Sequence, residues 1–157
     1  MIMLLGLALS LGACSSERSD FPVTKMTIQG QSFDLEIART PAARQRGLMQ
    51  RDSMPTYHGM IFIFDSAGIY PFWMHYTRFP LDIIWLSEQG QIVTITTMQS
   101  YVETTEQNTA PAWYVIELHG GMAHKLGLRA GMSVNLPPEV RAPVSGPASA
   151  HNSAGNS

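Results

Sequence analysis

Alternating apolar and polar residues predict a β-hairpin near the start of the folded part of the chain. In residues 33–37 (FDLEI), apolar residues alternate with Asp34 and Glu36, which predicts a strand with one apolar face and one face in solvent. Residues 23–29 alternate more weakly, and Gly30 follows them. The two segments and the glycine between them therefore predict two strands joined by a tight turn.

Four further segments have the length and composition of strands: residues 60–64 (MIFIF), 83–86 (IIWL), 91–98 (QIVTITTM) and 113–119 (WYVIELH). The first two are continuous apolar runs, which predicts burial on both faces. The third is rich in β-branched residues.

Two short helices interrupt this β-rich pattern. Thr40 suits an N-cap, Pro41 suits the first helical position, and Gly47 can take a left-handed C-cap conformation, so a helix is expected over residues 41–46. A second is expected over residues 121–126. Since strands outnumber helices and hairpin-like spacings dominate, we expect a mainly β single domain. Its architecture would be an antiparallel β-sandwich or a partly closed barrel.

The N-terminus has the features of an export signal. Residues 2–11 form an uncharged, almost wholly apolar run of about half the ~20 residues that a membrane-spanning helix needs. The residues that close it, Leu11-Gly12-Ala13-Cys14, resemble the lipobox of bacterial lipoprotein precursors. The resemblance implies a signal peptide over residues 1–13 and a diacylglyceryl group on Cys14. As the single cysteine of the chain, Cys14 has no intramolecular disulfide partner.

The residues after the cysteine fit a lipid-anchored protein. Residues 14–22 are mostly polar and predict a tether. Two or more acyl chains on Cys14 would hold the protein on a membrane, whereas one chain binds only marginally. We therefore expect a cell-envelope protein with its domain in the periplasm. By resemblance to enterobacterial sorting, Ser15 after the cysteine indicates the outer membrane.

Charge and composition bound the remaining organisation. The formal net charge is −2 and there is no basic stripe, which argues against nucleic acid as a partner. Residues 137–157 are rich in Pro, Ala, Ser, Gly and Asn, which predicts a disordered tail. Residues 23–136 remain as one domain, large enough to bury its own core.

Five segments of this domain resemble, in order, the motifs of the DUF192 family. They are residues 46–51 (RGLMQR), 59–64 (GMIFIF), 72–84 (FWMHYTRFPLDII), 114–118 (YVIEL) and 126–131 (LGLRAG). The resemblance implies a β-rich, often exported domain with a jelly-roll-like sandwich fold. The family is named for its unknown function. This chain departs from the pattern at Tyr76, where the family usually has Asn, and at Met132, where it has Asp.

The central motif holds the densest mixture of chemically useful side chains. In an extended segment Trp73, His75 and Thr77 would share one face, on which a ligand could stack and accept hydrogen bonds. The structural alternative is a core Trp73, a solvated His75 and an Asp82 that caps a loop or pairs with an arginine. Arg51 is the candidate partner, because bidentate arginine–carboxylate contacts are strong.

Basic residues gather around the first helix. Arg39, Arg44, Arg46 and Arg51 lie within a short stretch. They could form an anionic-ligand site, but a solvated helix face with one structural arginine is the favoured interpretation.

Motifs for catalysis and metal binding are weak. Glu117 and His119 lie two residues apart on a predicted strand and could pair as acid and base. No serine of the domain lies in a Gly-x-Ser-x-Gly motif, and His-x-x-x-His spacing is absent. The many methionines and the Met74-His75 pair raise copper binding, yet Met-x-Met runs are missing from the chain after the predicted signal peptide. We expect no cofactor and no metal.

The sequence thus predicts a non-catalytic, lipid-anchored domain that binds a small ligand or an envelope protein. One alternative is a hydrolase-type enzyme that acts on an envelope component through Asp82, Glu117 and a histidine. A weaker alternative is copper binding through Met and His. The candidate ligand-binding residues are Arg51, Trp73, His75, Thr77, Asp82 and Glu117.

Overall fold

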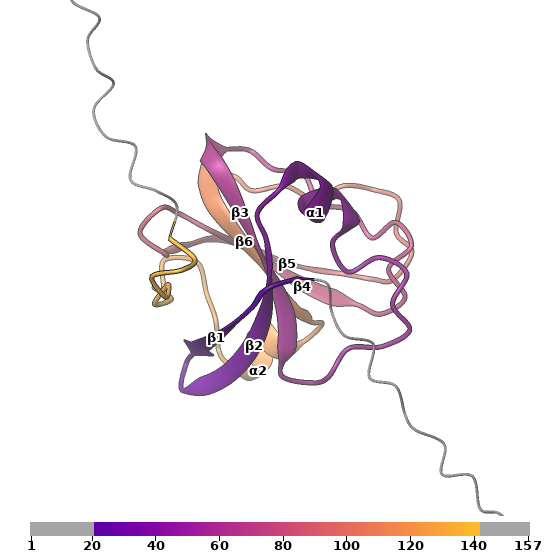
Figure 1. The fold of residues 1–157 in the computed structure, drawn as a ribbon, viewed down its shortest axis with the longest axis horizontal. Coiled ribbons are helices and arrows are strands. Elements are labelled where there is room, and N and C mark those ends of the chain that lie inside the picture. The colour runs from indigo at the N-terminus through magenta and orange to yellow at the C-terminus, as the bar shows by residue number, and fades with distance from the viewer. Residues whose placement is uncertain (1–20, 142–157) are drawn as a thin grey trace, which may run out of the picture.

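One six-stranded sheet forms the centre of the computed structural model, which describes residues 21–141 (Figure 1). Two short helices accompany it: α1 (Pro41–Arg46) and α2 (Met122–Lys125). The strands are β1 (Val23–Ile28), β2 (Gln31–Ala38), β3 (His58–Gly68), β4 (Leu81–Leu86), β5 (Ile92–Met98) and β6 (Ala112–His119). The predicted mainly β class with two short helices is confirmed.

The strand order is β1-β2-β3-β6-β4-β5, so the sheet is open, with β1 and β5 at its edges. Neighbouring strands are antiparallel except β2 and β3, which are parallel. The hairpin-like spacing predicted antiparallel pairing throughout, and for this pair it was wrong. Residues 39–57 form a long crossover that includes α1, which is the kind of connection that parallel neighbours require.

The predicted hairpin between β1 and β2 is confirmed. Ile28 pairs with Gln31, which leaves Gln29 and Gly30 as a two-residue turn. Both turn residues have positive φ, 48° and 79°, as a turn that follows the twist of the two strands requires.

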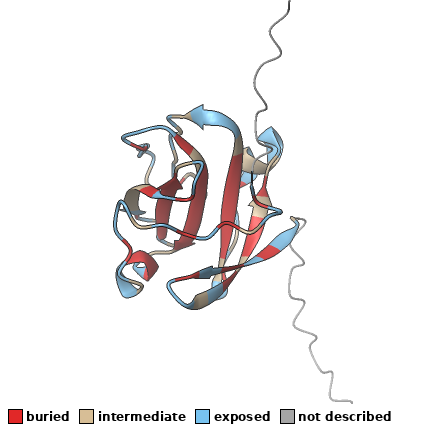
Figure 2. Cartoon of the chain, turned by 90° about the vertical axis from the view of Figure 1, so that its left-hand side faces the viewer, coloured by how far each residue is buried: buried red, intermediate tan, exposed pale blue. Residues whose placement is uncertain are grey.

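Each face of the sheet contributes to its own buried core cluster. The central strands β4 and β6 are buried along most of their length (Figure 2). The first face contributes Phe33, Leu35, Ile116 and Leu118, among others, and α2 and residues 128–140 pack over it. The second face contributes Met60, Phe62, Ile83 and Val115, and Leu48, Met54 and Met74 from the loops pack over it. Burial on both faces explains why residues 60–64 and 83–86 are continuously apolar.

Helix α1 follows its predicted bounds. The backbone N–H of Ala43 donates to Oγ1 of Thr40 at 3.1 Å, and Pro41 lies at the start of the helix. Gly47 ends the helix with a φ of 48°. The start and stop signals in the sequence therefore place this helix correctly.

Residues 137–141 pack against the domain, although the sequence assigned them to the tail. Val140 is fully buried in the first core cluster, and Oγ1 of Thr24 donates to the Glu139 carboxylate at 2.5 Å. The predicted signal peptide, the predicted lipid attachment site at Cys14 and the remainder of the predicted tail lie outside the described residues. None of the helices formed by residues 21–141 is both long and apolar enough to span a bilayer.

Candidate functional site

The central motif does not form the extended ligand face that the sequence predicted. Residues 69–80 form a loop between β3 and β4, in which Tyr76 turns with a φ of 51°. Trp73 is 51% exposed, whereas Thr77 is buried. The prediction that Trp73, His75 and Thr77 share one face was wrong, because the turn breaks the alternation of side chains. The ring of His75 lies 5.9 Å from that of Trp73, and its Nδ1 lies 3.0 Å from the Glu103 carboxylate.

The positive φ of Tyr76 explains the Asn that the family usually has at this position. Asn is among the non-glycine residues that adopt the left-handed region most readily. The replacement of Asn by Tyr76 therefore affects how easily the backbone adopts this turn.

Asp82 has a structural role on the first face of the sheet. It is fully buried on β4, and its carboxylate accepts hydrogen bonds from Oγ1 of Thr97 (2.6 Å) and from the backbone N–H groups of Gly121 (3.0 Å) and Ala123 (2.6 Å). It thereby fixes the start of α2. The expected pair between Asp82 and Arg51 was wrong. The alternative in which Asp82 caps a backbone segment describes its contacts.

Arg51 lies on the second face and pairs with Glu36. Its two terminal nitrogens donate to the two carboxylate oxygens of Glu36 at 2.5 and 2.7 Å. Glu36 is only 2% exposed, so the prediction that it faces solvent was also wrong. The alternation in β2 correctly placed Glu36 opposite Leu35 but could not show that loops cover its face. The pairing of β2 with the buried strand β3 shows that this face is covered, but that pairing comes from the tertiary structure and left no signal in the sequence.

Glu117 lies close to this pair on the same face. Glu36 pairs with Met60 in the register of β2 and β3, and Met60 pairs with Glu117 of β6. The backbones of the two glutamates are thus about 10 Å apart, two strand spacings. Burial raises the pKa of Glu117 from 4.5 to about 8, although the charge of Arg51 opposes the rise. Its buried Oε2 has no hydrogen-bond partner among residues 21–141.

The sheet separates Asp82 from the other two residues that were proposed for an enzyme. Glu117 and His119 share the second face, as their spacing predicted, while Asp82 lies on the first. Nε2 of His119 lies 2.6 Å from the backbone oxygen of Met54, to which its N–H donates. Asp82, Glu117 and His119 therefore do not converge on one pocket.

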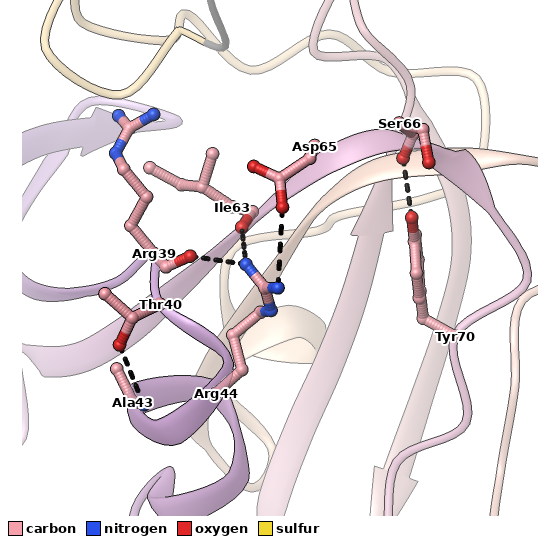
Figure 3. A network of polar contacts seen from close by, with 8 residues as sticks. All are labelled: Arg39, Thr40, Ala43, Arg44, Ile63, Asp65, Ser66 and Tyr70. Atoms are coloured by element: carbon pink, nitrogen blue, oxygen red, sulfur yellow. Dashed lines mark hydrogen bonds and ion pairs between the residues drawn. The ribbon is translucent and has the colours of Figure 1, made fainter.

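The arginines around α1 divide into structural and pocket-lining residues. Arg44 donates to the backbone oxygens of Arg39 and of Ile63 (2.8 Å for the latter), and it lies 3.6 Å from the Asp65 carboxylate (Figure 3). Arg44 thus ties α1 to β3. Arg39 and Arg46 instead border a cavity.

This cavity, which we call the α1 pocket, has a volume of about 520 Å³. It lies between α1, the end of β2, residues 21–22 before β1, and residue 139. That volume is within the range of small-molecule sites. Its lining is mostly apolar and carries two arginines and one glutamate: Phe21, Pro22, Ile37, Arg39, Thr40, Ala42, Ala43, Arg46 and Glu139.

The charged groups of the α1 pocket lie at its rim. Arg39 donates to the backbone oxygen of Glu139 at 2.8 Å, and the guanidinium of Arg46 lies 5.1 Å above the ring of Phe21. The hydrogen bond from Thr24 lowers the pKa of the Glu139 carboxyl, which keeps it ionised. Two positive charges and one negative charge leave the rim with a net positive charge.

A smaller cavity of about 190 Å³ lies on the other side of α1. Aromatic rings dominate its lining, and Trp73 lies at its edge. The ring of Phe64 stacks on that of Tyr70 at 3.5 Å. The volume holds a few water molecules or one small ring, so it is the lesser candidate for a ligand site.

Metal-binding groups do not assemble in the described part of the chain. Residues 21–141 contain no cluster of three or more His, Cys, Asp or Glu side chains with ligand geometry. Six methionines are buried in the core clusters, where their thioethers pack against apolar side chains: Met26, Met54, Met60, Met74, Met98 and Met122.

Comparison with known proteins identifies the family. Residues 24–136 match the model of DUF192, "Uncharacterized ACR", and the chain belongs to this family. This confirms the resemblance seen in the sequence motifs. No curated protein matches the chain.

Two solved structures are similar to this one. A putative transcription regulator from Sinorhizobium meliloti 1021 is 34% identical, with a TM-score of 0.64, over 72% of this chain and 90% of that one. A protein of unknown function from Novosphingobium aromaticivorans DSM 12444 is 35% identical, with a TM-score of 0.66, over 73% and 84% of the two chains. These similarities support a shared fold and leave the function of the family open.

Proposed function

We propose that this protein is a lipid-anchored domain of the cell envelope that binds a small amphipathic anion in the α1 pocket. The single observation that carries the binding proposal is the composition of that pocket. An apolar cavity of about 520 Å³ with two arginines at its rim suits an apolar molecule with one acidic group.

The α1 pocket replaces the surface that the sequence favoured. Trp73, His75 and Thr77 do not share a face, and Asp82 and Glu117 are buried on opposite sides of the sheet. Arg39 and Arg46, in contrast, border one cavity. The hypothesis that the arginines around α1 bind an anion is thus supported for Arg39 and Arg46.

The anchoring proposal places the domain in the periplasm, held by acyl chains on Cys14, at the outer membrane. Its support is the apolar leader that ends in Leu-Gly-Ala-Cys and the polar residues that follow. Replacement of Cys14 by Ser in the full chain should move the protein from the membrane fraction to the soluble periplasmic fraction. Intact mass should show the acyl groups on the native chain only. A Cys14→Ser protein that stays in the membrane with unchanged mass would contradict the proposal.

The binding proposal is testable with a probe of the same chemistry. Anilinonaphthalene sulfonate has an aromatic body and one fixed negative charge, and its fluorescence rises in an apolar site. Titration of the native protein should give a saturable one-to-one signal. Phenylnaphthylamine, which lacks the charge, should bind more weakly if the arginines contribute.

Matched variants on α1 and next to it locate the site. Ala42→Phe fills the α1 pocket and should weaken binding at least tenfold, and Arg39→Gln should weaken binding of the anion but not of the neutral dye. Gln45→Phe, on the side of the helix that borders the smaller cavity, is the control and should leave binding unchanged. Equal affinity in all three variants, with native circular dichroism, would refute the assignment of the pocket.

A further inference from the structure

A patch of exposed aromatic side chains lies on the loops that cover the second face of the sheet. Trp73, Tyr76 and Tyr101 are 51%, 55% and 57% exposed, and His75 lies between the first two. Its ring is 5.9 Å from that of Trp73 and 3.8 Å from that of Tyr76. We call these four residues the aromatic patch.

Backbone hydrogen bonds hold the loops of the patch together. The N–H of Tyr101 donates to the oxygen of Thr77 at 3.1 Å, and the N–H of Met74 donates to the oxygen of Val102 at 3.2 Å. Because Met74 and Thr77 are themselves buried, the exposed rings project from a fixed support. The aromatic patch is therefore a preformed surface.

The two tyrosines adopt a costly backbone conformation. Tyr76 has a φ of 51° and Tyr101 a φ of 59°, in the left-handed region that Gly and Asn enter most easily. Burial does not offset this strain, because both rings are more than half exposed. Strain of this kind, on an exposed aromatic residue, points to a role outside the packing of the domain.

We propose that the aromatic patch is the surface by which the domain rests on the bilayer that holds its own Cys14 lipid. This inference depends on the anchoring part of the proposed function. Trp and Tyr have apolar rings with a polar N–H or O–H, and they concentrate at the boundary between lipid tails and headgroups for that reason. A lone aromatic ring would bind weakly, but a short tether keeps the patch at high local concentration near the lipid.

The start of the described chain fits this orientation. Six residues lie between Cys14 and Phe21, and the seven Cα–Cα steps that link the two span at most about 25 Å, so Phe21 stays within that distance of the lipid-bearing residue. The ring of Phe21 lies 6.0 Å from the guanidinium of Arg51. The residue before Arg51, Gln50, donates its N–H to the oxygen of Tyr76 at 2.9 Å. The chain thus enters the domain on the side that carries the patch.

The charged side chains beside the patch include no surplus of cations. The Glu103 carboxylate lies 3.0 Å from Nδ1 of His75, and Arg78 forms an ion pair with Asp52. Whatever the charge of His75, these four residues offer no excess of positive charge for anionic lipids. The patch should dock on neutral phosphatidylcholine headgroups, and added salt should have little effect.

Quenching of tryptophan fluorescence by brominated lipid tests the contact. The full-length acylated protein would be reconstituted in phosphatidylcholine vesicles whose acyl chains carry bromine near the headgroup. The chain has three tryptophans, of which Trp85 is buried and Trp113 half-buried. We expect quenching of the native protein and its loss in Trp73→Phe.

Relocated tryptophans provide a matched pair of probes. In the Trp73→Phe background, Tyr76→Trp should restore the quenching. Tyr57→Trp should not, since Tyr57 is 42% exposed but packs against Phe33 of the first core cluster. Equal quenching of the two probes, or none at Trp73, would overturn the proposal.

Intact mass of the same sample separates the two proposals. If Cys14 carries no lipid, the anchoring proposal fails and the bilayer contact fails with it. If Cys14 is acylated and Trp73 is not quenched, only the aromatic patch proposal fails, and a protein partner becomes the alternative occupant.

Discussion

Asp82 and Glu117 lie on neighbouring strands and on opposite faces of the sheet, and the protein accommodates their burial in different ways. Asp82 accepts three hydrogen bonds from Thr97 and from the start of α2. Glu117 has a buried oxygen with no partner among the described residues, and its pKa rises to about 8. A buried carboxyl group must either gain donors for its charge or keep its proton.

Glu36 extends the comparison on the second face. It has the same chemistry as Glu117 and lies two strands away, yet Arg51 binds both of its carboxylate oxygens. Arg51 therefore binds the carboxylate of Glu36 directly, whereas it acts on Glu117 only through the electrostatic effect of its charge. The first face needs no cation at Asp82, because backbone N–H groups supply the donors.

The largest expected effect comes from removal of the cation. Arg51→Met leaves Glu36 buried without its partner, and the loss of one member of a buried ion pair typically costs about 3–5 kcal/mol. Urea unfolding at neutral pH would measure this loss. Arg46→Met, at an exposed arginine whose guanidinium lies over the ring of Phe21, should cost less than about 1 kcal/mol. Similar losses in the two variants would contradict the assignment of Arg51 as the essential cation.

The next effect is a dependence of stability on pH that comes from Glu117. Below about pH 4.5 both folded and unfolded states hold the proton, and above about pH 8 neither does. Between these values only the folded state holds it, so the free energy of unfolding should fall by about 1.4 kcal/mol per pH unit as the pH rises.

Unfolding of native protein and Glu117→Gln at pH 5.5, 6.5 and 7.5 would measure this slope. We expect the slope in the variant to be smaller by about 1.4 kcal/mol per pH unit, because the amide does not titrate. Glu88→Gln, in the exposed turn before β5, is the control and should keep the native slope. Parallel curves for native and Glu117→Gln would show that Glu117 does not retain its proton.

A smaller effect is expected on the first face. Asp82→Ala removes the acceptors of two backbone N–H groups and of Thr97, which should cost about 1–3 kcal/mol and loosen α2. Faster amide exchange at Ala123 would report the local opening. Thr97→Val removes one donor only and should cost about 0.5–1.5 kcal/mol. A Thr97→Val variant less stable than Asp82→Ala would exclude the capping role.

The smallest expected effect concerns the loop that covers the second face. Tyr76→Asn should raise the free energy of unfolding by roughly 1 kcal/mol, because Asn adopts a φ of 51° at lower cost. Thermal unfolding would detect it. Tyr57 is comparably exposed and does not have a positive φ, so Tyr57→Asn should give no gain in the free energy of unfolding. The same Tyr76→Asn change should weaken the proposed bilayer contact, so stability and contact would move in opposite directions.

Sequence patterns located most elements of the sheet but not the environment of their polar residues. Apolar runs found β3 and β4, and capping residues found α1, since these signals are local. The alternation in β2 separated Leu35 from Glu36 correctly. It could not reveal that the loop carrying Arg51 covers Glu36, because that contact joins residues brought together only by the crossover.

In the candidate site, too, the structure separates residues that lie close together in the sequence. Arg39, Arg44, Arg46 and Arg51 form one group in the sequence. In the structure Arg44 binds the backbone of β3 and Arg51 binds the buried Glu36, whereas Arg39 and Arg46 border the α1 pocket. Trp73, His75 and Thr77 were grouped by an assumed extended conformation that the turn at Tyr76 removes.

The sequence by itself determined the family, the mainly β class, the helix α1 and the hairpin, because each depends on motifs or on residues a few positions apart. Only the tertiary structure decided the parallel pairing of β2 and β3, the partners of Asp82 and Arg51, and the proton retained by Glu117. These properties depend on which segments cover each face of the sheet. Exclusion of water by distant segments sets the cost of a buried charge, and no local pattern carries that information.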